Sequence, residues 1–324
     1  MRLHENLQDF ETLVRLVSQD LGIREVYIEK DYWLTFLLKR LSEQPNANEI
    51  VFKGGTSLSK GYRIIRRFSE DIDLAVLRGS KNNSQTERFI KKIASALTEQ
   101  PFEEIHEEGK TSKKGMIRRT FHRYPRLLNN TNFGPVQDSL LLEINCFSEP
   151  SPSKKMPIES FISEYLKRRG QQGYIQEYLL LPFSIQVLDY RKTFVEKILS
   201  LAYASFTDKD QTPRELRARI RHFYDLAQLF SQKEVSSFLE SPDFSIWTQE
   251  VRREENLPDR TRWIKKKLHE APLFQKTETT LGRIKRFFKS DLEPLVFKPE
   301  DLPPFINVEQ TFKAITASIS KFDL

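Results

Sequence analysis

The sequence is poor in the residues that build disulfide-stapled, zinc-bound or membrane-spanning proteins. It holds a single cysteine, Cys146, in 324 residues, which excludes an internal disulfide framework. Its five histidines are dispersed and lack the ligand spacing of a zinc site. No stretch approaches the roughly 18 apolar residues that a membrane-spanning helix requires. We therefore expect neither a structural zinc nor a membrane partner.

Two common enzyme signatures are also missing. The sequence contains neither Gly-x-x-x-x-Gly-Lys-[Ser/Thr], which marks a P-loop, nor Gly-x-Ser-x-Gly, which marks a hydrolase nucleophile. Its first residues, 1–6, lead into a polar helix without the apolar region of a signal peptide, so a cytoplasmic location is expected. Apolar residues make up 38% of the chain, enough for a sizeable buried core.

Positive charge exceeds negative charge, with 52 Lys and Arg against 45 Asp and Glu, a net charge of +7. This balance suits a nucleic-acid partner. Seven cations, interleaved with three aromatic residues, crowd one segment: Lys110, Lys113, Lys114, Arg118, Arg119, Arg123 and Arg126, with Phe121, His122 and Tyr124. The segment is interpreted either as a surface that binds phosphates and stacks on bases, or as a strand pair with one solvated basic face.

Residues 51–60, Val-Phe-Lys-Gly-Gly-Thr-Ser-Leu-Ser-Lys, predict a strand, a turn and a helix. Gly54 and Gly55 let the backbone approach an anion closely. Thr56 or Ser57 is expected to cap the following helix, whose N-terminus favours negative charge. Alone, the segment is an ordinary turn and helix cap. Its position before an acidic strand indicates a phosphate-binding turn.

The acidic strand is predicted in residues 67–76, Arg-Phe-Ser-Glu-Asp-Ile-Asp-Leu-Ala-Val. Asp71 and Asp73 occupy alternate positions and project from one face, while the apolar residues between them face the core. Two carboxylates form a hard-oxygen site that suits Mg²⁺ or Mn²⁺ and leaves positions for water and substrate phosphate. Such a pair on an edge strand is otherwise a solvated face. Together the two segments predict a nucleotidyl-transfer site.

Three further residues extend this prediction. In the strand predicted over 139–147, Glu143 repeats the alternation of core residue and carboxylate, so it is either a third acid or base, or a partner for an arginine. Lys60 is expected near the phosphates, in a basic cluster on the helix between the two segments that also contains Arg63, Arg66 and Arg67. Ser69, two residues before Asp71, lies where covalent modification could block the metal site.

These segments resemble the AbiEii/AbiGii toxin family of nucleotidyltransferases, which includes MenT-like toxins and belongs to the polymerase-beta-like superfamily. The resemblance is carried by 52–58 and 67–74, by Glu-Lys-Asp-Tyr-Trp-Leu-Thr at 29–35 and by two later helices, so it covers about residues 20–230. The resemblance implies that Gly54, Gly55, Thr56, Ser57, Lys60 and Ser69 contact the nucleotide.

The resemblance also implies roles for residues outside the two segments. Lys197 matches a lysine that binds nucleotide phosphate, and Asp225 matches an aspartate that orients this lysine or the attacking hydroxyl. Asp31 is implied to face the cleft. The residues themselves admit other interpretations. These are a solvated lysine paired with a helical Glu, an intrahelical pair of Asp225 with Arg221, and a surface ion pair of Asp31 with a nearby lysine.

The implied activity is metal-dependent transfer of a nucleoside monophosphate from a nucleoside triphosphate, with release of pyrophosphate. Family members act as toxins of toxin–antitoxin or phage-defence systems, and some modify the 3′ end of tRNA, which blocks aminoacylation and translation. The resemblance therefore implies tRNA as the favoured acceptor and a cognate antitoxin as a partner. Two alternatives are a protein hydroxyl or small molecule as acceptor, and a non-catalytic module that binds RNA or a partner.

The predicted fold class is α+β, with N-terminal helices, a mixed-sheet core whose helices pack on one side, and a C-terminal helical region. The expected division is 1–205 for the core and 206–324 for the helical region. Residues 148–157, rich in Pro and Ser, predict a surface loop. Strands are expected at 50–53, 70–77, 102–107, 115–123 and 139–147. Helices are expected at 6–21, 24–43, 56–66, 84–99, 190–205, 214–231, 234–241, 245–254, 260–269 and 277–290.

Overall fold

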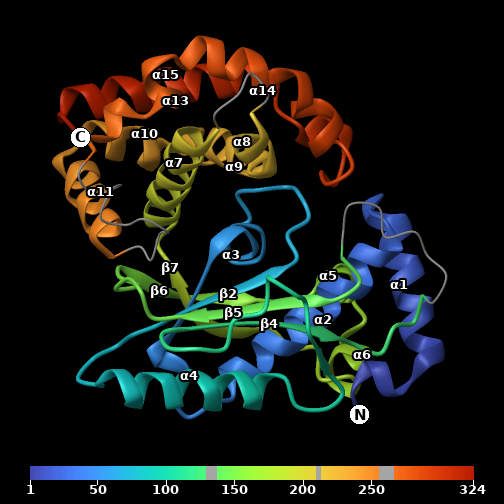
Figure 1. The fold of residues 1–324 in the computed structure, drawn as a ribbon. Coiled ribbons are helices and arrows are strands. Elements are labelled where there is room, and N and C mark those ends of the chain that lie inside the picture. The colour runs from blue at the N-terminus through green and yellow to red at the C-terminus, as the bar shows by residue number, and fades with distance from the viewer. Residues whose placement is uncertain (129–136, 209–212, 255–265) are drawn as a thin grey trace. The chain divides into compact units, whose positions relative to one another are not determined.

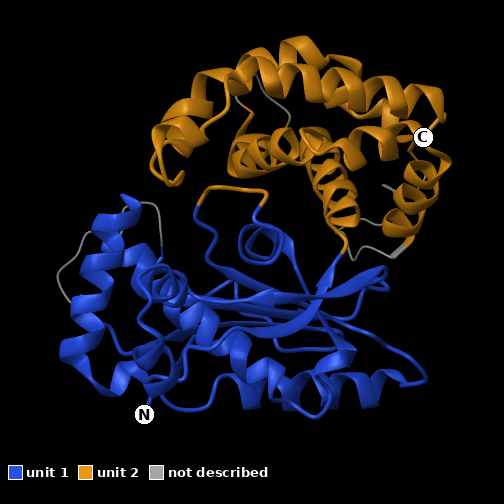
Figure 2. Cartoon of the chain, turned by 180° about the vertical axis from the view of Figure 1, so that it is seen from behind, with its two compact units in different colours: residues 1–63, 68–188 blue, residues 64–67, 189–324 orange. Residues whose placement is uncertain are grey.

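The computed structural model describes residues 1–128, 137–208, 213–254 and 266–324. The chain divides into two compact units (Figure 2). The first contains residues 1–63 and 68–188, and the second contains 64–67 and 189–324. The helix predicted over 190–205, which we expected to belong to the core, groups with the second unit.

The first unit is built on a seven-stranded sheet in the order β3-β4-β5-β2-β1-β7-β6 (Figure 1). Strand β2 runs parallel to β5, and β1 runs parallel to β7, while the remaining neighbours are antiparallel. The predicted α+β class with a mixed sheet is therefore confirmed. The strands are Ile50–Lys53 (β1), Asp71–Val76 (β2), Glu103–Ile105 (β3), Ile117–Arg123 (β4), Leu140–Asn145 (β5), Ser153–Ile158 (β6) and Phe183–Leu188 (β7).

Helices of the first unit lie on both faces of the sheet. Helix α4 lies on one face and α3 on the other (Figure 1), so the expectation of helices on one side only is wrong. Asn82 caps α4, and Gly22 ends α1 in the left-handed conformation with φ +68°. The helices are Leu7–Leu21 (α1), Glu25–Ser42 (α2), Gly54–Lys60 (α3), Asn83–Leu97 (α4), Phe161–Arg168 (α5) and Gln172–Glu177 (α6).

Two predicted segments, one helix and one loop, differ substantially from the structure. The helix expected over 56–66 is the shorter α3, which begins at Gly54 and ends before Gly61. The loop expected over 148–157 contains most of β6, which pairs with β7 from Ser153 onward. Strand β6 is an edge strand with exposed lysines, so it lacks the buried alternation that marks a strand in sequence.

The second unit is helical, as predicted. The helix expected over 214–231 is interrupted at Arg219, and α15 lies in a stretch for which we expected no helix. The helix expected over 260–269 lies largely outside the described residues. Among the helices that the structure describes, none is long and apolar enough to cross a bilayer. They are Tyr190–Thr207 (α7), Arg214–Ala218 (α8), Ile220–Phe230 (α9), Lys233–Glu240 (α10), Pro242–Glu254 (α11), Pro272–Gln275 (α13), Thr277–Leu292 (α14) and Phe305–Lys321 (α15).

Candidate active site

The two predicted metal-binding aspartates begin strand β2. Asp71 and Asp73 are half-buried, and they alternate with the fully buried Ile72 and Leu74, so both carboxylates project from one face. The ladder places Asp73 opposite Glu143 of the parallel strand β5. The alternation in the sequence thus brings three acids onto two adjoining strands.

Gly54 lies directly against this acidic face. It adopts φ +74°, a conformation that favours glycine, and a Cβ built on it would lie 2.1 Å from Oδ2 of Asp73. The space for a side chain is therefore taken by the carboxylate. Gly54 was predicted to let an anion approach the backbone. In the structure, the anion that lies there is the Asp73 carboxylate of the chain itself.

The hydroxyls after Gly54 connect the turn to β2. Thr56 and Ser57 are the third and fourth residues of α3, so the prediction that either caps the helix is wrong. Both are buried. Thr56 Oγ1 donates to the Asp71 carbonyl at 2.5 Å and lies 3.0 Å from Ser69 Oγ, while Ser57 Oγ donates to the Gly54 carbonyl at 2.8 Å. Their predicted contact with the triphosphate stays a prediction.

Glu143 lies beside Asp73 in the sheet and pairs with an arginine, as one of its two interpretations predicted. It is register partner to Asp73, and its Oε2 also accepts from Arg119 Nε at 2.7 Å and lies 2.5 Å from Arg119 Nη2. Its Oε1 accepts from Asn145 Nδ2 at 3.1 Å. A carboxylate that accepts from an arginine and an amide is held in place. Its role as a third acid stays a prediction.

The donor set around β2 fits magnesium or manganese better than a nitrogen- or sulfur-bound metal. Within the described ranges no group of three or more His, Cys, Asp and Glu side chains gathers as a complete metal cage. Magnesium requires no such cage, because it keeps several waters and is held by one or two carboxylates together with substrate phosphates. Asp71 and Asp73 beside the bare backbone of Gly54 provide those carboxylates.

The basic cluster predicted between the two segments does not share one helix. Only Lys60 lies on α3, where it is buried and its ammonium pairs with Asp31. Arg63 Nη2 lies 2.9 Å from a carboxylate oxygen of Glu159 and 2.9 Å from one of Glu164. The other two arginines, Arg66 and Arg67, belong to the second unit. The expectation of a joint phosphate-facing helix surface is therefore wrong, because α3 ends at Lys60.

Lys197 and Asp225 form a buried cluster with Arg67 inside the second unit. Lys197 Nζ lies 2.8 Å from Asp225 Oδ2, and Arg67 donates to both Asp225 oxygens at 2.8 and 2.7 Å. Burial raises the pKa of Asp225, but Arg67 and Lys197 outweigh it and hold that pKa well below 3.8. Asp225 thus holds the lysine rather than pairing with Arg221, and Lys197 is buried rather than solvated.

Asp31 lies in the interior and not at the surface. It is 3% exposed, pairs with Lys60 and accepts from the Phe161 backbone N–H at 2.9 Å. The alternative of a surface ion pair is therefore wrong. Sequence reasoning gave no role to its neighbour Lys30, nor to Arg67 as partner of Asp225.

The basic segment 110–126 keeps its cations at the surface but not its aromatics. Phe121, His122 and Tyr124 are 2%, 2% and 4% exposed, so they cannot stack on bases. Several cations have acidic partners: Lys113 pairs with Glu104, Lys110 with Glu107, Arg119 with Glu143 and Arg126 with Asp138. Of the two interpretations, the solvated basic face describes the segment better.

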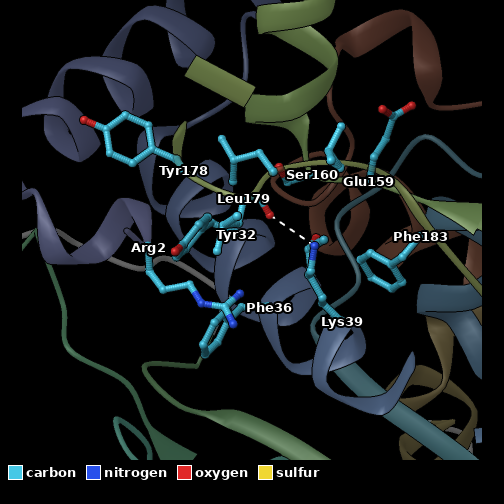
Figure 3. Close-up of a pocket in the computed structure, with 12 residues that line it drawn as sticks. Arg2, Tyr32, Phe36, Lys39, Glu159, Ser160, Tyr178, Leu179 and Phe183 are labelled. Atoms are coloured by element: carbon cyan, nitrogen blue, oxygen red, sulfur yellow. Dashed lines mark hydrogen bonds between the residues drawn. The ribbon is translucent and has the colours of Figure 1, made fainter. Parts of the chain in front are cut away.

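The first unit also contains a small cavity (Figure 3). Its volume is about 30 Å³. Lys39 Nζ donates to the Leu179 carbonyl at 3.2 Å beside it. The lining that the structure describes contains none of the predicted site residues.

Comparison with protein families identifies the family of this chain. The profile described as "Nucleotidyl transferase AbiEii toxin, Type IV TA system" matches residues 36–302, most of the chain. The chain belongs to this family. The predicted resemblance is thereby confirmed, and the AbiEii toxin is a nucleotidyltransferase of a type IV toxin–antitoxin system. Membership implies an antitoxin as partner.

One solved structure similar to this toxin is "MenT4, nucleotidyltransferase toxin Rv2826c from Mycobacterium tuberculosis H37Rv". It is 15% identical, the match covers 93% of this chain and 98% of that chain, and the TM-score is 0.42. A likeness of this size carries no argument about the site. Comparison with curated proteins found no match.

Proposed function

We propose that this AbiEii toxin transfers a nucleoside monophosphate from a nucleoside triphosphate to the 3′ end of tRNA in the cytoplasm, and that the transfer depends on magnesium. The observation that carries the proposal is the packing of the Gly54 backbone against Asp73, beside Asp71 on the same strand face. This juxtaposition supports a phosphate-binding turn and a metal-binding strand at one place. Modification of the tRNA 3′ end would block aminoacylation and so stop translation.

In the proposed reaction an acceptor hydroxyl oxygen attacks the α-phosphorus. A new phosphorus–oxygen ester bond forms, the bond to the bridging oxygen breaks, and pyrophosphate leaves with the electron pair. Asp71 and Asp73 would hold the metal, which when bound neutralises phosphate charge. Glu143 would take the hydroxyl proton after releasing Arg119. Lys197, oriented by Asp225, is the residue proposed to steady the charge of the transferred group.

A tRNA acceptor is supported by the net charge of +7 and by the surface cations of 110–126. Because the aromatic side chains of that segment are buried, base stacking does not support an RNA acceptor. They favour, as the second candidate, a protein hydroxyl or small molecule that is modified by the same chemistry. Both candidates need the same acids, so the acceptor must be tested separately.

The first experiment tests the transfer itself. The toxin is incubated with Mg²⁺, total tRNA and each of the four α-³²P-labelled nucleoside triphosphates. We expect label on tRNA with at least one nucleotide, and a loss of about 100-fold or more in Asp71→Asn and Asp73→Asn. Glu103→Gln is the matched control, because Glu103 is an exposed strand carboxylate of the same sheet. Label on neither RNA nor protein would contradict the proposal.

The second experiment separates the acceptors. Replacing Arg118 and Arg123 by Gln should lower tRNA labelling and make its loss with salt less steep, but leave transfer to a small hydroxyl acceptor unchanged. Lys154 and Lys155, exposed on β6 at the opposite edge of the sheet, provide the control pair for the same substitution. Equal tRNA labelling by both double variants would count against an RNA acceptor bound at β4.

A further inference from the structure

Helix α2 buries charged side chains next to the segments that carry the acids. The side chains of Lys30 and Asp31 are 0% and 4% exposed. Burying a charge is costly unless it is paired and hydrogen-bonded, so the partners of these residues indicate what they do. One turn before them, Tyr27 stacks on Phe68 with the ring centroids 4.3 Å apart and the planes at 7°. This face of α2 therefore packs on the segment that leads into β2.

Lys30 joins the approaches to two neighbouring strands. Its Nζ donates to Glu70 Oε2 at 2.7 Å and to the Gln137 carbonyl at 2.7 Å. The Gln137 N–H donates to the same Glu70 oxygen at 3.0 Å, which closes a three-membered network. Glu70 immediately precedes Asp71, and Gln137 lies three residues before β5. One ammonium thus fixes the starts of the parallel strands that carry Asp71, Asp73 and Glu143.

Asp31 makes the corresponding connection to α3. It pairs with Lys60, the last residue of that helix, and accepts from the Phe161 N–H, the first residue of α5. The first residue of α3 is Gly54, whose backbone lies on the Asp73 carboxylate. A short helix held at its last residue cannot slide or rotate without moving its first. Lys30 and Asp31 are adjacent in sequence and control the two elements that meet at the acids.

We infer that Lys30 and Asp31 are positioning residues of the metal site: Lys30 fixes β2 against β5 through Glu70 and Gln137, and Asp31 fixes α3 through Lys60. The inference rests on the proposed function and adds to it the residues that hold the acids in place. Lys60 in this arrangement acts through Asp31 and not on phosphate. Residues that support metal ligands in this way change metal affinity about 10- to 100-fold when they are replaced.

The test is metal binding by the full chain, without turnover. Free Mn²⁺ is measured by electron paramagnetic resonance during titration, first alone and then with the α,β-methylene analogues of the four nucleoside triphosphates. The variant Lys30→Met/Glu70→Gln removes the buried charges as a pair, so neither is left uncompensated. We expect it to fold, as judged by circular dichroism and thermal unfolding, and to bind Mn²⁺ about tenfold more weakly.

Arg40→Met is the matched control for a purely structural effect. Arg40 lies on the same helix, and its guanidinium donates to the carbonyls of Leu97 and Glu99 at 3.1 and 2.8 Å, at the end of α4. Its loss should lower the unfolding temperature and leave Mn²⁺ affinity unchanged. Mn²⁺ affinity within twofold of wild type in a folded Lys30→Met/Glu70→Gln variant would overturn the inference.

Two further variants test the inference if the first variant does not fold. If Lys30→Met/Glu70→Gln does not fold, Asp31→Asn/Lys60→Met and Lys30→Arg are judged by the same tenfold and twofold criteria. The first titration contains Mn²⁺ and no nucleotide. A phosphate contact of Lys60 therefore cannot explain a change in the Mn²⁺ affinity measured there. If wild type binds no Mn²⁺, or Asp71→Asn binds it normally, the proposed function fails. If only the positioning variants bind normally, the inference alone fails.

Discussion

The carboxylate of Asp73 occupies the place where a side chain on Gly54 would begin, with Oδ2 only 2.1 Å from an ideal Cβ. Gly54→Ala must therefore displace either the turn or the proposed metal-binding acid, and at φ +74° it also strains the backbone. We expect nucleotidyl transfer to fall about 100-fold or more, which is measured as the initial rate of label transfer.

Gly79→Ala provides the control for this prediction. Gly79 also has a positive φ, +53°, but no described atom lies within 4 Å of its ideal Cβ. Its substitution should cost about 1–2 kcal/mol of stability through backbone strain and leave the transfer rate unchanged. Equal rates in the two alanine variants would show that the contact between Gly54 and Asp73 has no catalytic importance.

Asp225→Asn should destabilise the second unit by about 3–5 kcal/mol, because it leaves Arg67 and Lys197 buried without their counter-charge. In the wild type, the folded pKa of Asp225 lies below its unfolded value, despite burial, because of Arg67 and Lys197. Its stabilisation is therefore present above about pH 4 and is lost as the pH falls further. Urea unfolding at pH 7 and between pH 4 and 2 measures both effects.

The exposed Asp243 of the same unit is the matched control for that substitution. Asp243→Asn should shift the urea midpoint only slightly, as is usual for a surface residue. A midpoint for Asp225→Asn equal to that of Asp243→Asn would mean that the buried cluster does not stabilise the fold.

His122 should make the toxin less stable in mild acid. Burial lowers the pKa of His122 from 6.5 to about 4, and its Nδ1 has no hydrogen-bond partner among the described residues. Between these pH values the unfolded chain binds a proton that the folded chain does not, so the free energy of unfolding rises with pH. The gain is at most about 3 kcal/mol. His122→Gln should flatten this dependence, whereas the exposed His106→Gln should leave it as in wild type.

Arg119 should compete with metal for Glu143. The Arg119 side chain is 43% exposed, so its ion pair with Glu143 is worth about 0.2–1 kcal/mol. Arg119→Met is therefore expected to tighten Mn²⁺ binding about two- to fivefold, and Glu143→Gln to weaken it. Arg118→Met, at the adjacent position of β4, is the control. Unchanged affinity in both Arg119→Met and Glu143→Gln would remove Glu143 from the metal site.

The parts of this candidate site that depend on patterns of neighbouring residues could be predicted from the sequence. Alternating apolar and acidic residues identify β2 and β5, and the glycine pair identifies the start of α3. The partners of the buried charges leave no such pattern. Arg67 and Asp225 are 158 residues apart, and Lys30 and Glu70 are 40 apart, so only the fold shows that they pair. The charged residues of α2 make its sequence look partly exposed to water. In the structure these residues are buried and face charged or polar partners.

The wrong predictions for the basic segment and for the arginines after Lys60 have a similar origin. In residues 118–126 cations are interleaved with aromatics, and the sequence alone does not say which set faces the core. The sheet settles this, because β4 buries Phe121 and His122 between its neighbours β3 and β5. The arginines after Lys60 appeared to share its helix, but the chain turns at Gly61 and Arg63, which has φ +58°.

The strand order has a consequence for the timing of toxicity in the host. Strands β1 and β2 are made early, yet their parallel neighbours, β7 and β5, follow much later in the chain. A nascent chain that has emerged only through α4 already contains Gly54, Asp71 and Asp73 on the pair of β1 and β2, but lacks both parallel strands that flank this pair. Non-local pairing of this kind forms only after the distant segment has been synthesised. Fragments released by a ribosome that stops before β7 would therefore carry the proposed site residues and still be harmless.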